Sequence, residues 1–127
     1  MMKKIAEIML YVDNQEESKN FWTEKLGFIV VSDEDNGEGL RWIELVPAVG
    51  SETSLILHNK KIIAKMQPEL NLATPSLMFC TEDIDHLHKD YQDKQVKVGE
   101  LVTMPFGKVF NFADNEDHYF AVKQIRT

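Results

Sequence analysis

An internal repeat constrains the fold of this chain more than any other feature of its sequence. Met9-Leu10-Tyr11-Val12-Asp13 aligns with Met78-Phe79-Cys80-Thr81-Glu82, an offset of 69 residues. The same offset pairs Trp22 with Tyr91 and Lys25 with Lys94. Self-similarity at a fixed spacing indicates that one supersecondary unit occurs twice. We therefore expect two copies of the same small module.

The length of 127 residues suits one domain, because two independent cores would each have too little apolar surface to bury. We expect a single domain over residues 1–127. Its first repeat spans about 5–58, a linker spans 59–74, and its second repeat spans about 75–124.

Hydrophobic alternation and turn residues predict the order strand, helix, strand, strand, strand within each repeat. The first helix begins at Asp13 or Asn14, with Glu16 placed as in a capping box after Asp13, and ends at Gly27. The second helix begins at Asp83. The linker carries at most one short helical turn. The expected strands are 5–12, 28–33, 40–46 and 53–58, then 76–81, 96–102, 108–113 and 119–124.

Composition narrows the range of partners. The formal net charge is −7, from 14 basic and 21 acidic residues, and no basic patch is visible. We therefore expect no nucleic-acid partner. No apolar run reaches the roughly 20 residues of a membrane span, so we expect no membrane partner. A single cysteine, Cys80, is typical of a reducing compartment, and we expect a cytoplasmic protein.

Alternation along the strands separates a buried face from an open one. Ala6, Ile8, Leu10 and Val12 form a wholly apolar face that should lie against the helices. The sequence does not decide which side chains of the third and seventh strands point to the open face. Five residues are therefore only possible contributors to that face: Arg41, Trp42, Glu44, Phe110 and Asn111. The open face is expected to carry Glu7, Met9, Tyr11, Ser54, Ile56, His58, Ser76, Met78, Cys80, Tyr119, Ala121 and Lys123.

The repeat, Tyr11-Val12-Asp13 and the stretch Phe21-Trp22-Thr23-Glu24-Lys25-Leu26-Gly27-Phe28 resemble the vicinal-oxygen-chelate superfamily. This superfamily includes glyoxalase I, fosfomycin- and bleomycin-resistance proteins and extradiol dioxygenases. The resemblance implies an α+β fold in which two tandem βαβββ modules form a cupped mixed sheet with the helices outside. It also implies a homodimer.

Metal-dependent members of that superfamily place their ligands on the first and last strands of each module. Carried over residue by residue, these positions fall on Glu7, on Ile56 or His58, on Ser76 and on Ala121. A catalytic metal centre normally needs three protein ligands and an open position. Because serine is a poor ligand and alanine supplies none, we expect no metal and no cofactor.

The resemblance and the residues together predict a protein of the bleomycin-resistance type, with a degenerate metal site, that binds a small organic molecule in the cup. The alternative is a lyase, isomerase or dioxygenase of the same superfamily that uses Glu7 or His58, with or without a divalent metal. The sequence leaves open whether the chain is an enzyme, and Glu7 is the candidate catalytic residue. The expected ligand-binding residues are Glu7, Met9, Tyr11, Ile56, His58, Ser76, Met78, Tyr119 and Ala121.

Overall fold

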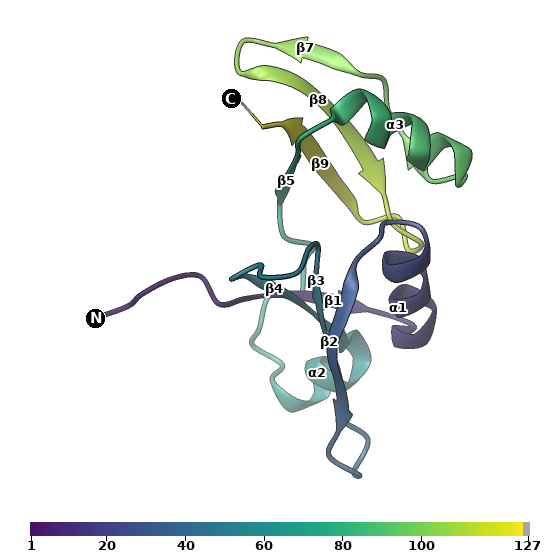
Figure 1. Ribbon diagram of the computed structural model, residues 1–127. Helices are drawn as coiled ribbons and strands as arrows, with labels where there is room; N and C mark the ends of the chain where they lie inside the picture. The colour runs from purple at the N-terminus through teal and green to yellow at the C-terminus, as the bar shows by residue number, and fades with distance from the viewer. Residues whose placement is uncertain (126–127) are drawn as a thin grey trace. The chain divides into compact units, whose positions relative to one another are not determined.

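The computed structural model describes residues 1–125, and these form two compact units. Unit 1 runs from Met1 to Pro75, and unit 2 begins at Ser76 (Figure 1). Within the described residues, no helix is long and apolar enough to cross a membrane.

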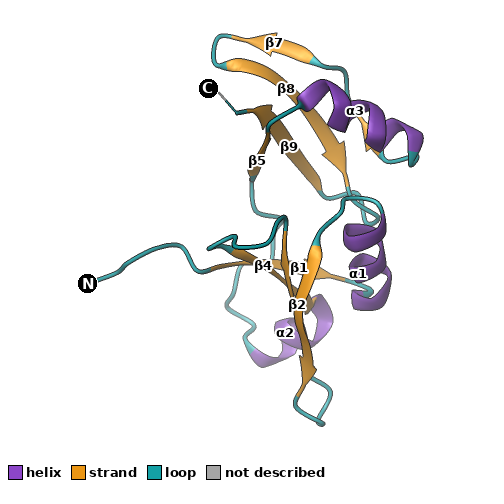
Figure 2. Cartoon of the chain, in the orientation of Figure 1, coloured by secondary structure: helices purple, strands orange, loops and turns teal. Residues whose placement is uncertain are grey.

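Unit 1 contains a four-stranded mixed sheet and two helices (Figure 2). The strand order is β1-β4-β3-β2, with β1 parallel to β4 and the other pairs antiparallel. Its elements are β1 (Glu7–Val12), α1 (Gln15–Glu24), β2 (Ile29–Asp35), β3 (Arg41–Val46), β4 (Ser54–Asn59) and α2 (Lys60–Met66).

The core of unit 1 lies between α1 and one face of this sheet. Leu10, Ile43 and Leu57 point to that face and are fully buried, as is Trp22 of α1. The Trp22 ring meets Phe28 edge to face, with centroids 4.9 Å apart. The helix begins after Asn14, whose side chain accepts a hydrogen bond of 3.0 Å from the backbone N–H of Glu17. The capping box expected from Asp13 and Glu16 is therefore wrong by one residue.

As far as residue 125, unit 2 contains a five-stranded mixed sheet and one helix. The strand order is β5-β9-β8-β6, and β7 also pairs with β8. Phe112 and Phe120 of the sheet are buried with Tyr91 of α3, in a largely aromatic core. Its elements are β5 (Met78–Thr81), α3 (Ile84–Asp93), β6 (Lys97–Val98), β7 (Val102–Met104), β8 (Gly107–Ala113) and β9 (Tyr119–Gln124).

The α+β class and the predicted order of elements are confirmed in both units, with three differences in detail. The strand expected at 96–102 is divided into β6 and β7, because its pairing with β8 shifts by one residue between Val98, which lies opposite Phe112, and Val102, which lies opposite Val109. Residues 60–66 form the helix α2, which is longer than a single turn. Strand β5 starts at Met78, so Ser76 precedes it.

Candidate functional site

The register of β3 decides which of its residues share the open face of unit 1. Trp42 lies opposite His58, and Glu44 lies opposite Ile56. On the other side of β4, Tyr11 lies opposite His58 and Met9 opposite Ile56. Since paired residues point to the same side of a sheet, these side chains share the face turned away from α1. We call the six residues the ring face: Met9, Tyr11, Trp42, Glu44, Ile56 and His58.

Three ring-bearing side chains form a row across the ring face. Tyr11, His58 and Trp42 occupy directly paired positions on β1, β4 and β3, which are neighbouring strands about 4.8 Å apart. The Tyr11 and His58 rings are stacked, with centroids 6.0 Å apart and planes inclined by 22°. All three side chains are half-buried. A row of this kind presents π surface to a planar molecule.

His58, in the middle of the row, is held in its uncharged form. Burial lowers the pKa of His58 below its ordinary value, and the negative charge of Glu7 opposes that shift. The Nδ1 atom is buried and has no hydrogen-bond partner among residues 1–125. The ring is therefore a neutral imidazole at pH 7, suited to packing and to hydrogen bonding rather than to charge pairing.

Glu7 and His58 are not placed to bind one metal ion. Glu7 is paired with Ser54, and His58 lies four residues further along β4, a separation of about 13 Å between backbone positions. Glu7 is exposed rather than enclosed by apolar neighbours. In the described part of the chain, no three His, Cys, Asp or Glu side chains gather as a metal site would require. The other two expected positions hold a serine, which is a poor ligand, and an alanine, which supplies no ligand atom.

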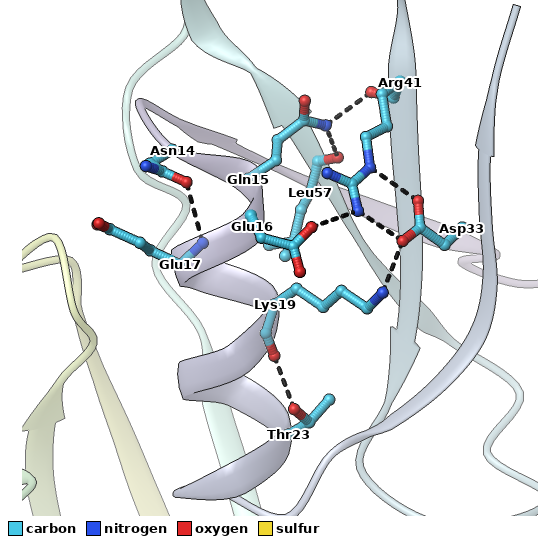
Figure 3. Close-up of polar contacts among 9 residues, drawn as sticks. All are labelled: Asn14, Gln15, Glu16, Glu17, Lys19, Thr23, Asp33, Arg41 and Leu57. Atoms are coloured by element: carbon cyan, nitrogen blue, oxygen red, sulfur yellow. Dashed lines mark hydrogen bonds and ion pairs between the residues drawn. The ribbon is translucent and has the colours of Figure 1, made fainter.

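The opposite face of the same sheet carries a charged network that positions α1 (Figure 3). Asp33 accepts hydrogen bonds from Arg41 at 2.8 and 2.6 Å and from Lys19 of α1 at 2.7 Å. The hydrogen bond from Arg41 is the main reason that the pKa of Asp33 lies well below its ordinary range. The Gln15 amide, at the start of α1, donates to the carbonyls of Arg41 and Leu57. Arg41 therefore joins the helix to the sheet and lies off the ring face.

We expect Asp33→Asn to lower the free energy of unfolding at pH 7 by about 1–2 kcal/mol, because a partly exposed carboxylate loses two charged partners. The unfolded chain binds a proton at Asp33 near pH 3.9 and the native chain only at lower pH, so the stabilisation is complete above about pH 5 and declines below about pH 4. Urea denaturation at several pH values measures this. Glu16→Gln, which removes a more exposed partner of Arg41, is the control. An equal loss of unfolding free energy in both variants at pH 7 would contradict the role assigned to Asp33.

Unit 2 has a corresponding open face on its own sheet. Met78 and Cys80 of β5 lie opposite Ala121 and Lys123 of β9, and Asn111 of β8 also lies opposite Ala121. Met78 and Tyr119 are 48% and 58% exposed, so this face is available to a ligand. An open hollow of about 380 Å³ lies at its edge, lined by Cys80, Phe106, Lys123, Gln124 and Ile125.

The structure divides the sequence-predicted site residues between the two units. Glu7, Met9, Tyr11, Ile56 and His58 share one face of unit 1, whereas Met78, Tyr119 and Ala121 share one face of unit 2. Ser76 is exposed ahead of β5. For five residues the sequence left undecided on which side of the sheet the side chain lies. Three of them lie on these open faces: Trp42, Glu44 and Asn111. The other two, Arg41 and Phe110, lie on the faces packed against the helices.

Comparisons with known proteins agree with this fold. The family model described as Glyoxalase/Bleomycin resistance protein/Dioxygenase superfamily matches residues 4–122. Protein YetH of Bacillus subtilis (strain 168), described as uncharacterized, is 30% identical over 125 residues, which are 98% of this chain and 100% of that protein.

Solved structures match over nearly the whole chain. TnmS3, an antibiotic binding protein from Streptomyces sp. CB03234, is 24% identical with a TM-score of 0.83 and covers 98% of both chains. A glyoxalase/bleomycin resistance protein from the same organism is 25% identical with a TM-score of 0.75, covering 95% of this chain and 100% of that one.

Proposed function

The chain belongs to the Glyoxalase/Bleomycin resistance protein/Dioxygenase superfamily, and from this premise we propose that it binds a small organic molecule on the ring face of unit 1. In this proposal the superfamily's metal site is degenerate and the ligand is held without being transformed. The likeness to TnmS3, which is described as an antibiotic binding protein, supports a small-molecule ligand. The single cysteine supports a cytoplasmic location.

The row of rings formed by Tyr11, His58 and Trp42 is the observation that carries this proposal. A half-buried row of rings exposes apolar and π surface at the centre of a sheet whose other face is already packed against α1. Small-molecule sites are mostly apolar, with a few polar groups that orient the ligand. Met9, which is half-buried, supplies apolar surface beside the row, and Glu44 supplies a polar group.

Mass spectrometry of small molecules retained by the gently purified protein tests the proposal. We expect a compound to be released on denaturation of the wild-type protein and to be depleted in a preparation of Trp42→Ala. Trp42→Phe, which keeps a ring at this position, is the matched control. Equal retention by all three proteins, or retention of nothing together with no hit in a broad thermal-shift screen, would contradict ligand binding on the ring face.

The protein is expected to be largely free of metal. The donor set at the superfamily's ligand positions motivates this expectation, since Ser76 and Ala121 occupy two of the four. Elemental analysis of untagged protein purified without chelator should give well below one Ni, Zn, Mn or Fe per chain. Near-stoichiometric metal that is lost in Glu7→Gln or His58→Gln would overturn the degenerate site.

We also expect a homodimer. The outer strands of the unit 1 sheet are β1 and β2, and β2 exposes Ile29 and Val31 at 40% and 55%. Exposed apolar edge strands are usually paired or covered. Light scattering at micromolar concentration should therefore give twice the 14.7 kDa of one chain. A mass of one chain under these conditions would count against dimerisation.

The alternative function is an enzyme that uses Glu7 or His58 in acid–base chemistry. The neutral imidazole of His58 favours it, because an uncharged ring accepts a proton. The two functions differ in the fate of the retained compound. A binding protein returns it unchanged after prolonged incubation, whereas an enzyme converts it and loses that conversion in His58→Gln or Glu7→Gln.

A further inference from the structure

Glu44 is a half-buried carboxylate on the β3 side of the ring face, and the hydrogen bonds that it accepts from residues 1–125 come from hydroxyl groups. One oxygen, Oε2, accepts a hydrogen bond of 2.5 Å from the Ser54 hydroxyl, and Oε1 lies 3.5 Å from the Ser32 hydroxyl. Among residues 1–125, the structure gives Glu44 no cationic partner. A carboxylate has about four acceptor positions, so Glu44 keeps capacity for a further donor.

The contrast with Asp33 shows what is unusual about this group. Both carboxylates are partly buried on the unit 1 sheet, but Asp33, on the opposite face, binds Arg41 and Lys19. Partial removal of a charge from water is costly unless it is paired. Glu44 has hydroxyl donors without a counter-charge and faces the side of the sheet proposed to bind a ligand. The missing counter-charge is therefore expected to come from the ligand.

The other charges on this face have the same sign. Glu7 on β1 and Glu34 on β2 occupy same-face positions, since Glu7 pairs with Ser54 and Glu34 with Trp42. Lys60 and Lys61 begin α2, beyond the end of β4, and both are exposed. A face with one sign of charge attracts ligands of the opposite sign. Trp42 and Tyr11 add to this preference, because aromatic faces attract cations.

We propose that the ligand of the ring face is a planar aromatic compound that bears a protonated amine, with its ring on the row formed by Tyr11, His58 and Trp42 and its ammonium group at Glu44. The inference rests on the proposed function and specifies its ligand class. Glu44 is two residues from Trp42 along β3, so its backbone position lies about 7 Å from that of Trp42 at the end of the row. An anionic ligand of the same shape is disfavoured.

Three naphthalene compounds of matched shape test the ligand class: 2-(naphthalen-2-yl)ethylamine, 2-(naphthalen-2-yl)ethanol and naphthalen-2-ylacetate. At pH 7 they are cationic, neutral and anionic. Isothermal titration calorimetry of the full chain should rank them in that order, with the amine binding about tenfold more tightly than the alcohol. Glu44→Gln keeps the shape and an acceptor for Ser54 while it removes the charge. This substitution should lower the affinity for the amine about tenfold and change the affinity for the alcohol by no more than about twofold.

Glu24→Gln, which removes an exposed carboxylate of α1, is the matched control and should change nothing. Equal affinities for the amine and the alcohol, or a Glu44→Gln protein with unchanged preference, would overturn the inference and leave the proposed function standing. Binding of none of the three probes would also overturn it, and the retained-compound experiment then decides separately whether the proposed function fails.

Discussion

Replacing Trp42 with alanine should weaken the binding of 2-(naphthalen-2-yl)ethylamine by about tenfold or more, because aromatic anchors at the centre of a site carry much of its binding free energy. Trp42 lies on the inner strand β3, next to both His58 and Glu44, and belongs to neither the α1 interface nor the charged network around Asp33. Its loss should therefore reduce binding far more than it disturbs the fold. Titration calorimetry gives the affinity.

Two measurements show whether weaker binding by Trp42→Ala comes from loss of the ring rather than from loss of the fold. Circular dichroism and the denaturation midpoint of Trp42→Ala should show that the chain is still folded. Trp42→Phe should keep most of the affinity, since a phenyl ring also stacks on a planar ligand. Unchanged affinity in folded Trp42→Ala would remove the row of rings from the site.

The second large effect is on stability and concerns Asp114 in the turn between β8 and β9. The Asp114 side chain is fully buried and accepts three hydrogen bonds, from the backbone N–H groups of Glu116 and His118 at 2.9 Å each and from His118 Nδ1 at 2.8 Å. Asp114→Ala leaves these donors unpaired, at a cost of about 2–4 kcal/mol. Urea denaturation measures the loss.

Asp93→Ala is the control for Asp114, because Asp93 makes only an exposed ion pair with Lys89. Its free energy of unfolding should change by no more than about 0.5 kcal/mol. A loss below about 1 kcal/mol for Asp114→Ala would contradict the assigned role of the carboxylate. Because the turn belongs to unit 2, Asp114→Ala should leave the side chains of the ring face in unit 1 unchanged.

The order of elements could be predicted because local pattern and tertiary role agree. Leu10 and Val12 flank the more polar Tyr11 on β1, and both are buried as that alternation predicts. The repeat predicts that unit 2 has the same order. The division of its second strand could not be predicted, because it depends on a one-residue shift in the pairing of this segment with β8.

The parity of β3 could not be predicted for a different physical reason. Arg41 is charged, yet it lies on the face packed against α1, where the carboxylates of Asp33 and Glu16 neutralise it. Polarity alone would assign Arg41 to the open face and Trp42 to the core. Only the pairing of Trp42 with His58 reverses this choice. The two residues most important to the proposed ligand, Trp42 and Glu44, were therefore only possible contributors from sequence.

Nuclear magnetic resonance of the two indole N–H groups tests the proposed binding face most directly. The chain has two tryptophans, Trp42 on the ring face and Trp22 on α1, which is fully buried in the core of unit 1. On titration with 2-(naphthalen-2-yl)ethylamine, the Trp42 signal should move in a saturable manner while the Trp22 signal stays in place. Saturable binding that leaves the Trp42 signal unmoved would contradict ligand binding on the ring face.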